Sequence, residues 1–266
     1  MKLIQGKTLA RGWLEACEHL LTTRGWQDTT VVLSVDEPAL MSREDKCVAD
    51  TLNTFLVSHN QPNNHTVAET IFPGYEYIHR GVDGVFKTYP DELYPRLESH
   101  DDTRNWGTYA HRLLRRTDRK GKPYNPLEVL INKMREKRPV RASYEIGLGL
   151  DVDVATYDSD EDRKSRLGGP CLSHLSFKLL DKSIHLTVMY RFHYYVQRAF
   201  GNLLGLARLQ SFVAKQVGVS IGPLVCHSTL AVLDHEKGWK KSAIPPLVTA
   251  CRAHLTSATI THPQLA

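Results

Sequence analysis

Apolar residues recur at helical spacing in the first part of the chain. Between positions 7 and 24 they follow one face of a helix, and Gly25 comes next as a natural helix stop. Ser42 can cap a second helix, which is expected to end before the turn-forming stretch 61–64. The pattern predicts two amphipathic helices here.

Three more helices are predicted further along the chain. Asn125 and Pro126 are typical of a helix start, because proline fits the first helical position. Apolar residues at helical spacing over 202–217 predict the next helix, and Gly218 ends it. Pro245 and its neighbour open a short last helix.

After Pro170 the pattern changes to a period of two, which is typical of strands with one buried face. Apolar residues alternate along 175–179 and 184–190, and the residues 181–183 between them read as a turn. We therefore expect a β-hairpin. Two other apolar runs predict strands, at 30–35 and 224–233.

Adjacent strands and interspersed helices alternate irregularly along the sequence. This order predicts an α+β fold with a mostly antiparallel or mixed sheet and flanking helices, and it argues against a doubly wound parallel sheet. The chain has 266 residues and a hydrophobic content of 41%, which suffices for one domain over residues 1–266. The length alone would also permit two smaller domains.

The formal net charge of +5 is modest, and the basic residues are scattered along the chain. Phosphate groups are compatible with this balance, whereas a nucleic-acid polymer is not expected, because no basic stripe with interleaved aromatic residues is present. No apolar run is long enough for a signal peptide or a membrane span. We expect a cytoplasmic protein without a membrane partner.

Cysteine usage and an acidic segment exclude two kinds of site. The five cysteines are widely spaced and contain no CxxC pair, which argues against a disulfide framework and a zinc knuckle. The segment 151–166 is rich in Asp and Arg and predicts a solvated loop. It does not fit a calcium-binding loop, because Thr156 stands where the sharp turn requires glycine.

Cys171 and Arg191 stand at the two open ends of the predicted hairpin. Folding of the hairpin brings these ends together, so Arg191 is expected to depress the pKa of Cys171 and to offer a phosphate-binding cation. A cysteine at a strand start is, taken alone, more typical of a small buried apolar residue. Its spacing to other residues favours a chemical role.

Pro170-Cys171, Arg191 twenty residues on and Asn202 eleven residues later resemble the core of the thymidylate synthase family. The resemblance covers about half of the chain. It implies a thymidylate synthase-like fold in which Cys171 attacks carbon 6 of a pyrimidine, Arg191 binds the nucleotide phosphate and Asn202 reads the edge of the base.

Other residues of the resemblance supply further expected roles. Gly107-Thr108-Tyr109 resembles the segment whose tyrosine, here Tyr109, helps to remove the proton at carbon 5. Lys137 and Arg138 resemble the basic pair that crosses a dimer interface to the partner's phosphate. Glu69 is the candidate general base and Asp50 the second choice, although an isolated carboxylate is more often a surface charge.

The chain departs from the family pattern at several positions. Phe192 replaces a phosphate-binding serine, and Tyr194 replaces the aspartate that contacts the folate pterin. Segment 232–234 replaces a His-x-Tyr motif that holds the sugar, and Leu172 replaces the histidine after the nucleophile. The identity of the one-carbon donor and the type of sugar in the nucleotide therefore stay open.

The resemblance implies a homodimeric methyl- or hydroxymethyltransferase that acts on a pyrimidine nucleoside monophosphate, with 5,10-methylenetetrahydrofolate as donor. Asn202 favours uracil, because an amide can donate to O4 and accept from N3–H. Two alternatives stay open: a non-catalytic nucleotide- or partner-binding protein, and a folate-independent enzyme that modifies carbon 5. His193 and His227 could approach the same site, although structural histidines with satisfied hydrogen bonds are more common.

Overall fold

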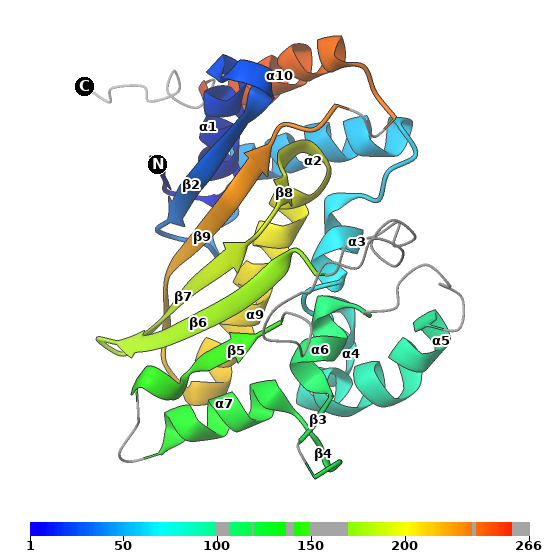
Figure 1. Ribbon diagram of the computed structural model, residues 1–266, viewed down its shortest axis with the longest axis vertical. Helices are drawn as coiled ribbons and strands as arrows, with labels where there is room; N and C mark the ends of the chain where they lie inside the picture. Colours follow the sequence, from blue (N-terminus) through cyan, green and yellow to red (C-terminus); the bar gives the residue numbers. More distant parts are fainter. Residues whose placement is uncertain (99–106, 119, 137–140, 149–169, 236–237, 257–266) are drawn as a thin grey trace, which may run out of the picture.

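The computed structural model describes residues 1–98, 107–118, 120–136, 141–148, 170–235 and 238–256 (Figure 1). Lys137, Arg138 and the predicted loop 151–166 lie outside the described residues.

A seven-stranded mixed sheet forms the centre of the fold. The strands, in spatial order, are β1 (Lys2–Gly6), β2 (Gln27–Val35), β9 (Ser220–Val232), β7 (Ser183–Tyr190), β6 (Leu172–Leu180) and β5 (Glu145–Gly147), with β8 (His193–Tyr194) beside β9. The pairs β2–β9, β7–β6 and β6–β5 are antiparallel, whereas β1–β2, β7–β9 and β8–β9 are parallel. The predicted α+β class is confirmed.

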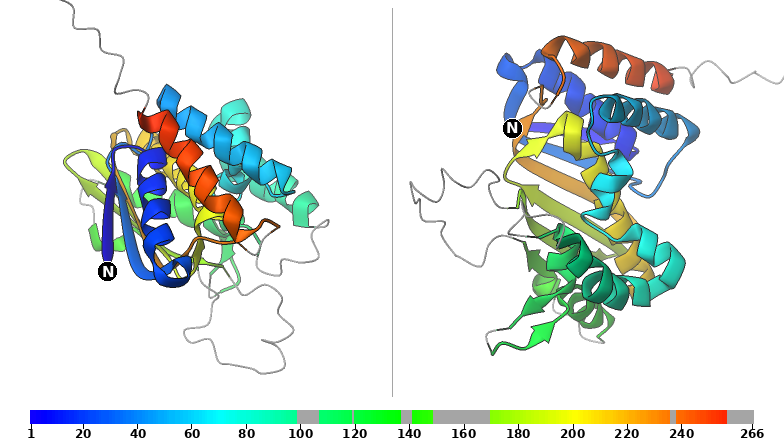
Figure 2. Two further views of the ribbon diagram at one scale, coloured as in Figure 1. Left: turned by 90° about the horizontal axis from the view of Figure 1, so that it is seen from above. Right: turned by 90° about the vertical axis from the view of Figure 1, so that its right-hand side faces the viewer.

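Helices cover one face of this sheet (Figures 1 and 2). The inner helices α1 (Leu9–Thr22) and α9 (Phe200–Val217) pack on the strands, and α10 (Ile244–Thr256) packs on α1 and α2 (Arg43–Ser58). Trp13 marks the core, since its buried indole donates a hydrogen bond of 2.7 Å to the carbonyl of Tyr195 and meets the Phe200 ring edge-on.

The opposite face of the sheet carries exposed side chains. On β7 the buried residues alternate with exposed Thr187 and Met189, and Leu180 is exposed at the end of β6. This alternation is the expected pattern of a sheet with one face on the core.

Local signals in the sequence account for most element ends. Asp181 and Lys182 both adopt positive φ angles, 47° and 56°, as a tight hairpin turn requires. Ser42 forms a capping box with Asp45 at the start of α2, and Gly218 ends α9 in the left-handed conformation. The predicted helices at 7–24, 202–217 and after Asn125 are confirmed, as is the hairpin.

No helix in the described parts of the chain is long and apolar enough to cross a bilayer.

The segment between α2 and the β6–β7 hairpin forms short helices and a second, smaller hairpin of β3 and β4. The elements are α3 (Asn64–Glu69), α4 (Gly74–Asp83), the π-helix η2 (Gly84–Leu93), α5 (Tyr94–Glu98), α6 (Tyr109–Leu114), β3 (Arg116–Thr117), β4 (Pro123–Tyr124) and α7 (Pro126–Arg135), and the remaining short turns are η1 (Arg24–Trp26), η3 (Arg141–Ser143), η4 (Tyr195–Ala199) and η5 (Lys241–Ala243).

Helix α3 packs directly against α9, where Gly201 makes the close approach possible. A Cβ atom at this position would lie 2.6 Å from the Cβ of Val67 and 2.8 Å from the carbonyl oxygen of Asn64. Such distances are far below van der Waals contact, so any larger residue would push the helices apart. The packing brings α3, which ends at Glu69, alongside the middle of α9.

Candidate functional site

Tyr109 connects α6 to the first residues of β6. Its hydroxyl oxygen accepts hydrogen bonds from the backbone nitrogens of Cys171 at 2.9 Å and Leu172 at 3.1 Å. Thr108 caps α6 and sets the tyrosine at the first helical position, since its Oγ1 accepts from the nitrogen of His111. The structure thus places Tyr109, expected near the reacting carbon, against the backbone of Cys171.

Cys171 and Arg191 face one another where the hairpin opens. The backbone nitrogen of Arg191 donates to the carbonyl oxygen of Cys171 at 2.9 Å, and the guanidinium group hydrogen-bonds the thiol. Thr229 on β9 holds the backbone of Arg191 in place, because its hydroxyl donates to the carbonyl of Arg191 at 2.7 Å. Three of the residues expected at the site, Tyr109, Cys171 and Arg191, therefore form one cluster.

Burial and the neighbouring cation Arg191 shift the pKa of Cys171 in opposite directions. Burial raises the pKa of the half-buried Cys171 thiol, and the charge and hydrogen bond of Arg191 lower it by less. Arg191 acts in the expected direction, but the net pKa of Cys171 lies above its usual value. Burial also raises the pKa of Tyr109 to about 12.

Tyr190 lies behind this cluster, although the sequence signals gave it no role. Its ring stacks on His193 with centroids 4.0 Å apart, and its hydroxyl is buried without a hydrogen-bond partner among the described residues. Burial raises the pKa of Tyr190, with smaller contributions from Tyr109 and Cys171. Tyr190 thus connects the thiol cluster to the buried polar groups around His193.

Asn202 is buried in the first turn of α9, and its amide nitrogen lies 3.0 Å from Nε2 of His193. The other ring nitrogen of His193 lies 3.0 Å from the hydroxyl of Ser228. Burial lowers the pKa of His193 to about 3, so the ring is neutral. His193 is a satisfied structural histidine, as expected, whereas Nε2 of His227 is buried without a described partner.

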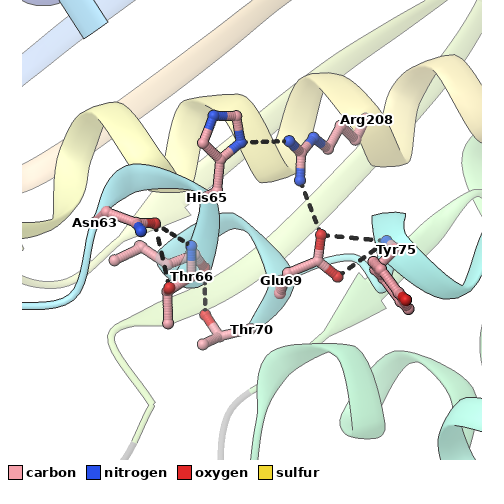
Figure 3. Close-up of polar contacts among 8 residues, drawn as sticks. Asn63, His65, Thr66, Glu69, Thr70, Tyr75 and Arg208 are labelled. Carbon is pink, nitrogen blue, oxygen red and sulfur yellow. Dashed lines mark hydrogen bonds and ion pairs between the residues drawn. The ribbon is translucent and has the colours of Figure 1, made fainter. Parts of the chain in front are cut away.

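Glu69 lies in a second cluster of polar groups, between α3, α4 and α9 (Figure 3). Arg208 donates to its Oε1 at 3.0 Å and lies 2.9 Å from Nδ1 of His65. The backbone nitrogen of Tyr75 donates to both carboxylate oxygens at 3.2 and 3.3 Å. Gly74 permits this geometry, because a Cβ atom there would lie 3.0 Å from Oε1 of Glu69.

Glu69 also borders a cavity of about 480 Å³. The walls combine aromatic and aliphatic groups with the carboxylates of Glu69, Glu76 and Glu98. The lining residues are Thr66, Glu69, Thr70, Pro73, Tyr75, Glu76, Tyr89, Leu93, Tyr94, Leu97, Glu98, Gly107 and Thr108. Thr108 therefore faces this cavity while the next residue, Tyr109, contacts Cys171.

A backbone hydrogen bond joins the two clusters. The nitrogen of Ala110 donates to the carbonyl of Thr70 at 2.9 Å, so the first turn of α6 is tied to the end of α3. Glu69 and Cys171 thus lie on elements that are connected through Tyr109 and Ala110. The second candidate base, Asp50, is exposed on α2.

Positions where the chain departs from the resemblance gather at a smaller cavity of about 320 Å³. Phe192, Tyr194, Val232 and Asp234 all line it, together with Gly25, Gln27 and His235. Asp234 also holds the chain, because its buried carboxylate accepts from the nitrogen of Val196 at 2.8 Å. These four replaced positions therefore border one cavity, whereas Leu172 is buried and is not among its lining residues.

No protein-family model matches the chain. Among curated proteins, it is 30% identical over 135 residues to "Putative thymidylate synthase" of Methanococcoides burtonii, which covers 50% of this chain and 55% of the relative. A protein of the same name from Methanosarcina mazei is 38% identical over 111 residues, or 41% and 46% of the two chains. The protein from Methanothermobacter thermautotrophicus is 36% identical over 78 residues, or 29% and 35%.

The chain is thus similar, over about half of its length, to archaeal proteins that are named putative thymidylate synthase, in agreement with the resemblance seen in the sequence. Its α+β fold agrees with the predicted class. The chain spans about half the length of the curated relatives it matches.

Proposed function

We propose that the protein transfers a one-carbon group to carbon 5 of a pyrimidine nucleoside monophosphate, as a methylase or a hydroxymethylase, through a covalent bond between Cys171 and carbon 6. The observation that supports this most directly is the cluster of Tyr109, Cys171 and Arg191 at the open end of the hairpin. The names of the archaeal relatives point to the same class of enzyme.

Cys171 acts as the nucleophile in this proposal. Its Sγ bonds to carbon 6, and the electron pair of the 5,6 double bond moves toward carbon 5 and the O4 carbonyl. Carbon 5 then bonds to the one-carbon unit and loses its proton, and the bond between that unit and its carrier nitrogen breaks. Addition of a hydride to the unit gives the methyl product, addition of water gives the hydroxymethyl product, and either addition expels Sγ as the 5,6 double bond re-forms. A bound methylenetetrahydrofolate would supply the hydride as well as the one-carbon unit. Because burial raises the pKa of Cys171, the guanidinium of Arg191 is needed to stabilise the thiolate in the attack.

The other residues bind and orient the nucleotide. Arg191 is exposed enough to bind the phosphate as well as the thiol, since a guanidinium has several donors. Asn202 reads the edge of the base. Tyr109 and Glu69 take part in removing the proton from carbon 5, Tyr109 from beside Cys171 and Glu69 from the wall of the larger cavity.

The larger cavity fits a folate-type donor. Its volume of about 480 Å³ lies in the range of small-molecule sites, and its tyrosine and leucine walls suit a planar ring. Tyr89, Tyr94 and Glu98 would hold such a ring, because a carboxylate accepts hydrogen bonds from ring N–H groups. When bound, methylenetetrahydrofolate supplies the one-carbon unit.

We further propose a homodimer, in which the exposed face of the sheet packs on a second copy and Lys137 and Arg138 reach the partner's phosphate site. The exposed side chains of Thr187, Met189 and Leu180 on that face support this arrangement. Light scattering after size exclusion tests it, and a monomer at micromolar concentration would contradict it.

Release of tritium from dUMP labelled at carbon 5 tests the proposed reaction. We expect release with methylenetetrahydrofolate, loss of release in Cys171→Ala, and retention in Cys47→Ala, which removes another partly buried thiol. Release that needs no folate would redirect the proposal to a folate-independent modification of carbon 5. Absence of release, together with measurable nucleotide binding, would favour a non-catalytic binding protein.

A further inference from the structure

The sheet ladder is interrupted on both sides of Thr229, which lies on β9 between β2 and β7 (Figure 1). The antiparallel register of β2 and β9 sets Thr30 opposite Thr229, but this pair is missing from the ladder. Thr30 has a φ angle of 56°, in the left-handed region that β-branched residues rarely adopt. Strained backbone of this kind is concentrated at functional sites.

The second interruption lies on the side of β7. The parallel ladder with β9 stops at Tyr190 and resumes at His193 with the same offset between the strands, so Arg191 stands opposite Thr229 at a bend outside the ladder. The hydroxyl of Thr229 lies 2.7 Å from the carbonyl oxygen of Arg191 and 3.3 Å from that of Tyr190. A hydroxyl has one hydrogen, so the shorter contact is the principal bond.

Hydrogen bonds hold the backbone of Arg191 from two neighbouring strands. Its nitrogen donates to the carbonyl of Cys171 at 2.9 Å, and its carbonyl accepts from Thr229 on β9. The guanidinium of Arg191 bonds the thiol of Cys171 from the end of a long side chain that is largely exposed. Packing gives such a side chain little support, so its direction depends on the backbone from which it starts.

We propose that Thr229 is a positioning residue for Arg191, and that its hydroxyl fixes the bend from which the guanidinium reaches the thiol of Cys171 and the phosphate of the nucleotide. This inference rests on the proposed function, in which Arg191 serves both groups. Thr229 acts through the backbone of Arg191. Loss of its hydroxyl should therefore weaken the effect of Arg191 on the thiol while the positive charge stays in the chain.

The rate of iodoacetamide alkylation at Cys171 measures this effect in the free protein, near neutral pH and without nucleotide. In Thr229→Val, which keeps the branched shape, we expect the rate to fall by about threefold, because a thiol that loses part of the influence of Arg191 forms less thiolate. The fall should not exceed that in Arg191→Ala. Thr229→Ser keeps the hydroxyl and should react at the wild-type rate.

Thr187→Val is the matched control. It makes the same change at an exposed position of β7 that lies within the regular ladder with β9, so the alkylation rate of Cys171 should stay at its wild-type value. Where Thr229→Val does not fold, Thr229→Ala removes the same hydroxyl and takes its place in the comparison.

A double-mutant cycle separates positioning from a general loosening of the sheet. In the Arg191→Ala background, Thr229→Val should leave the alkylation rate unchanged, because no guanidinium remains to be misplaced. A threefold fall in this background as well would show a structural effect and overturn the proposal. Equal rates in wild type and Thr229→Val, or equal losses in Thr229→Val and Thr229→Ser, would overturn the role of the hydroxyl.

The proposed function fails or stands on a separate measurement, since alkylation needs no substrate. Absence of tritium release by wild type, together with the expected alkylation rates in the Thr229 and Arg191 variants, would overturn the transferase and leave the positioning of Arg191 intact. Release by wild type with unchanged alkylation in Thr229→Val would do the reverse.

Discussion

The hydroxyl of Tyr109 accepts a hydrogen bond of 2.9 Å from the backbone nitrogen of Cys171. A second bond, of 3.1 Å from Leu172, uses the other lone pair of the same oxygen. Two successive backbone N–H groups are therefore satisfied by one oxygen. The side chain of Tyr109 thus holds the backbone around Cys171 in place.

Replacement of Tyr109 by phenylalanine should weaken both folding and reaction. The change leaves two backbone N–H groups unsatisfied, which costs about 1–3 kcal/mol when such groups are buried. Urea denaturation should show this loss, and covalent capture of a nucleotide should slow by at least about tenfold. Tyr124→Phe, at an exposed position, should change neither quantity. Equal stability of Tyr109→Phe and wild type would show that the two bonds contribute nothing.

The pH dependence of Cys171 alkylation should show the opposite effects of burial and Arg191 on the pKa of the thiol. Because burial raises the pKa of the thiol, its thiolate should form at higher pH than that of an ordinary cysteine. Arg191→Ala removes the group that lowers this pKa, so the midpoint should move further up, and Arg191→Lys should lie between the two. Iodoacetamide rates at Cys171 measure the midpoint. A downward shift in Arg191→Ala would contradict the electrostatic account.

Arg208 should matter for reaction rate more than for nucleotide affinity, because it holds the carboxylate of Glu69 at the cavity wall. In Arg208→Ala we expect tritium release to slow by about tenfold or more, and in Glu69→Gln by about a hundredfold. The matched control is Lys215→Ala, which removes a cation of the same helix that lies over the ring of Tyr77. Equal rates in Arg208→Ala and Lys215→Ala would argue against a role for the Glu69 pair.

His193 should make the protein sensitive to acid. Its pKa is lowered to about 3 in the folded state from an ordinary value of 6.5, so below pH 6.5 the unfolded chain binds a proton that the folded protein excludes. Stability is therefore lost as the pH falls from 6.5 toward 3, by about 1.4 kcal/mol for each pH unit. The stability difference between wild type and His193→Gln should shrink by this amount on acidification. A constant difference between pH 7 and pH 4 would contradict the buried, neutral state.

Elements with strong local signals could be predicted from the sequence. The hairpin turn at Asp181 and Lys182, the cap at Ser42 and the stop at Gly218 depend on the conformations of single residues, and all three were found as expected. The π-helix η2 gave no such signal, because Pro90 lies inside it and breaks the usual helical pattern. The parallel pairing of β7 with β9 is also invisible in the sequence, since it joins strands through a long crossover.

Some residues of the candidate site could likewise be predicted from the sequence, and others could not. Cys171 and Arg191 were expected to meet because one hairpin joins them, and their spacing carried the resemblance. Arg208 and Ser228 gave no signal, because their partners Glu69 and His193 are distant in sequence and meet only through helix and sheet packing. A charged residue within the apolar pattern of α9 was the single hint at Arg208, and such residues are more often solvent-exposed.

Intact-mass analysis after incubation with 5-fluoro-dUMP and methylenetetrahydrofolate tests whether Cys171 forms a covalent bond to the nucleotide. Fluorine at carbon 5 cannot leave as a proton, so the covalent nucleotide stays on the enzyme. We expect an adduct on wild type and Cys47→Ala and none on Cys171→Ala. Absence of any adduct on wild type, or an adduct that persists in Cys171→Ala, would contradict a covalent mechanism through Cys171.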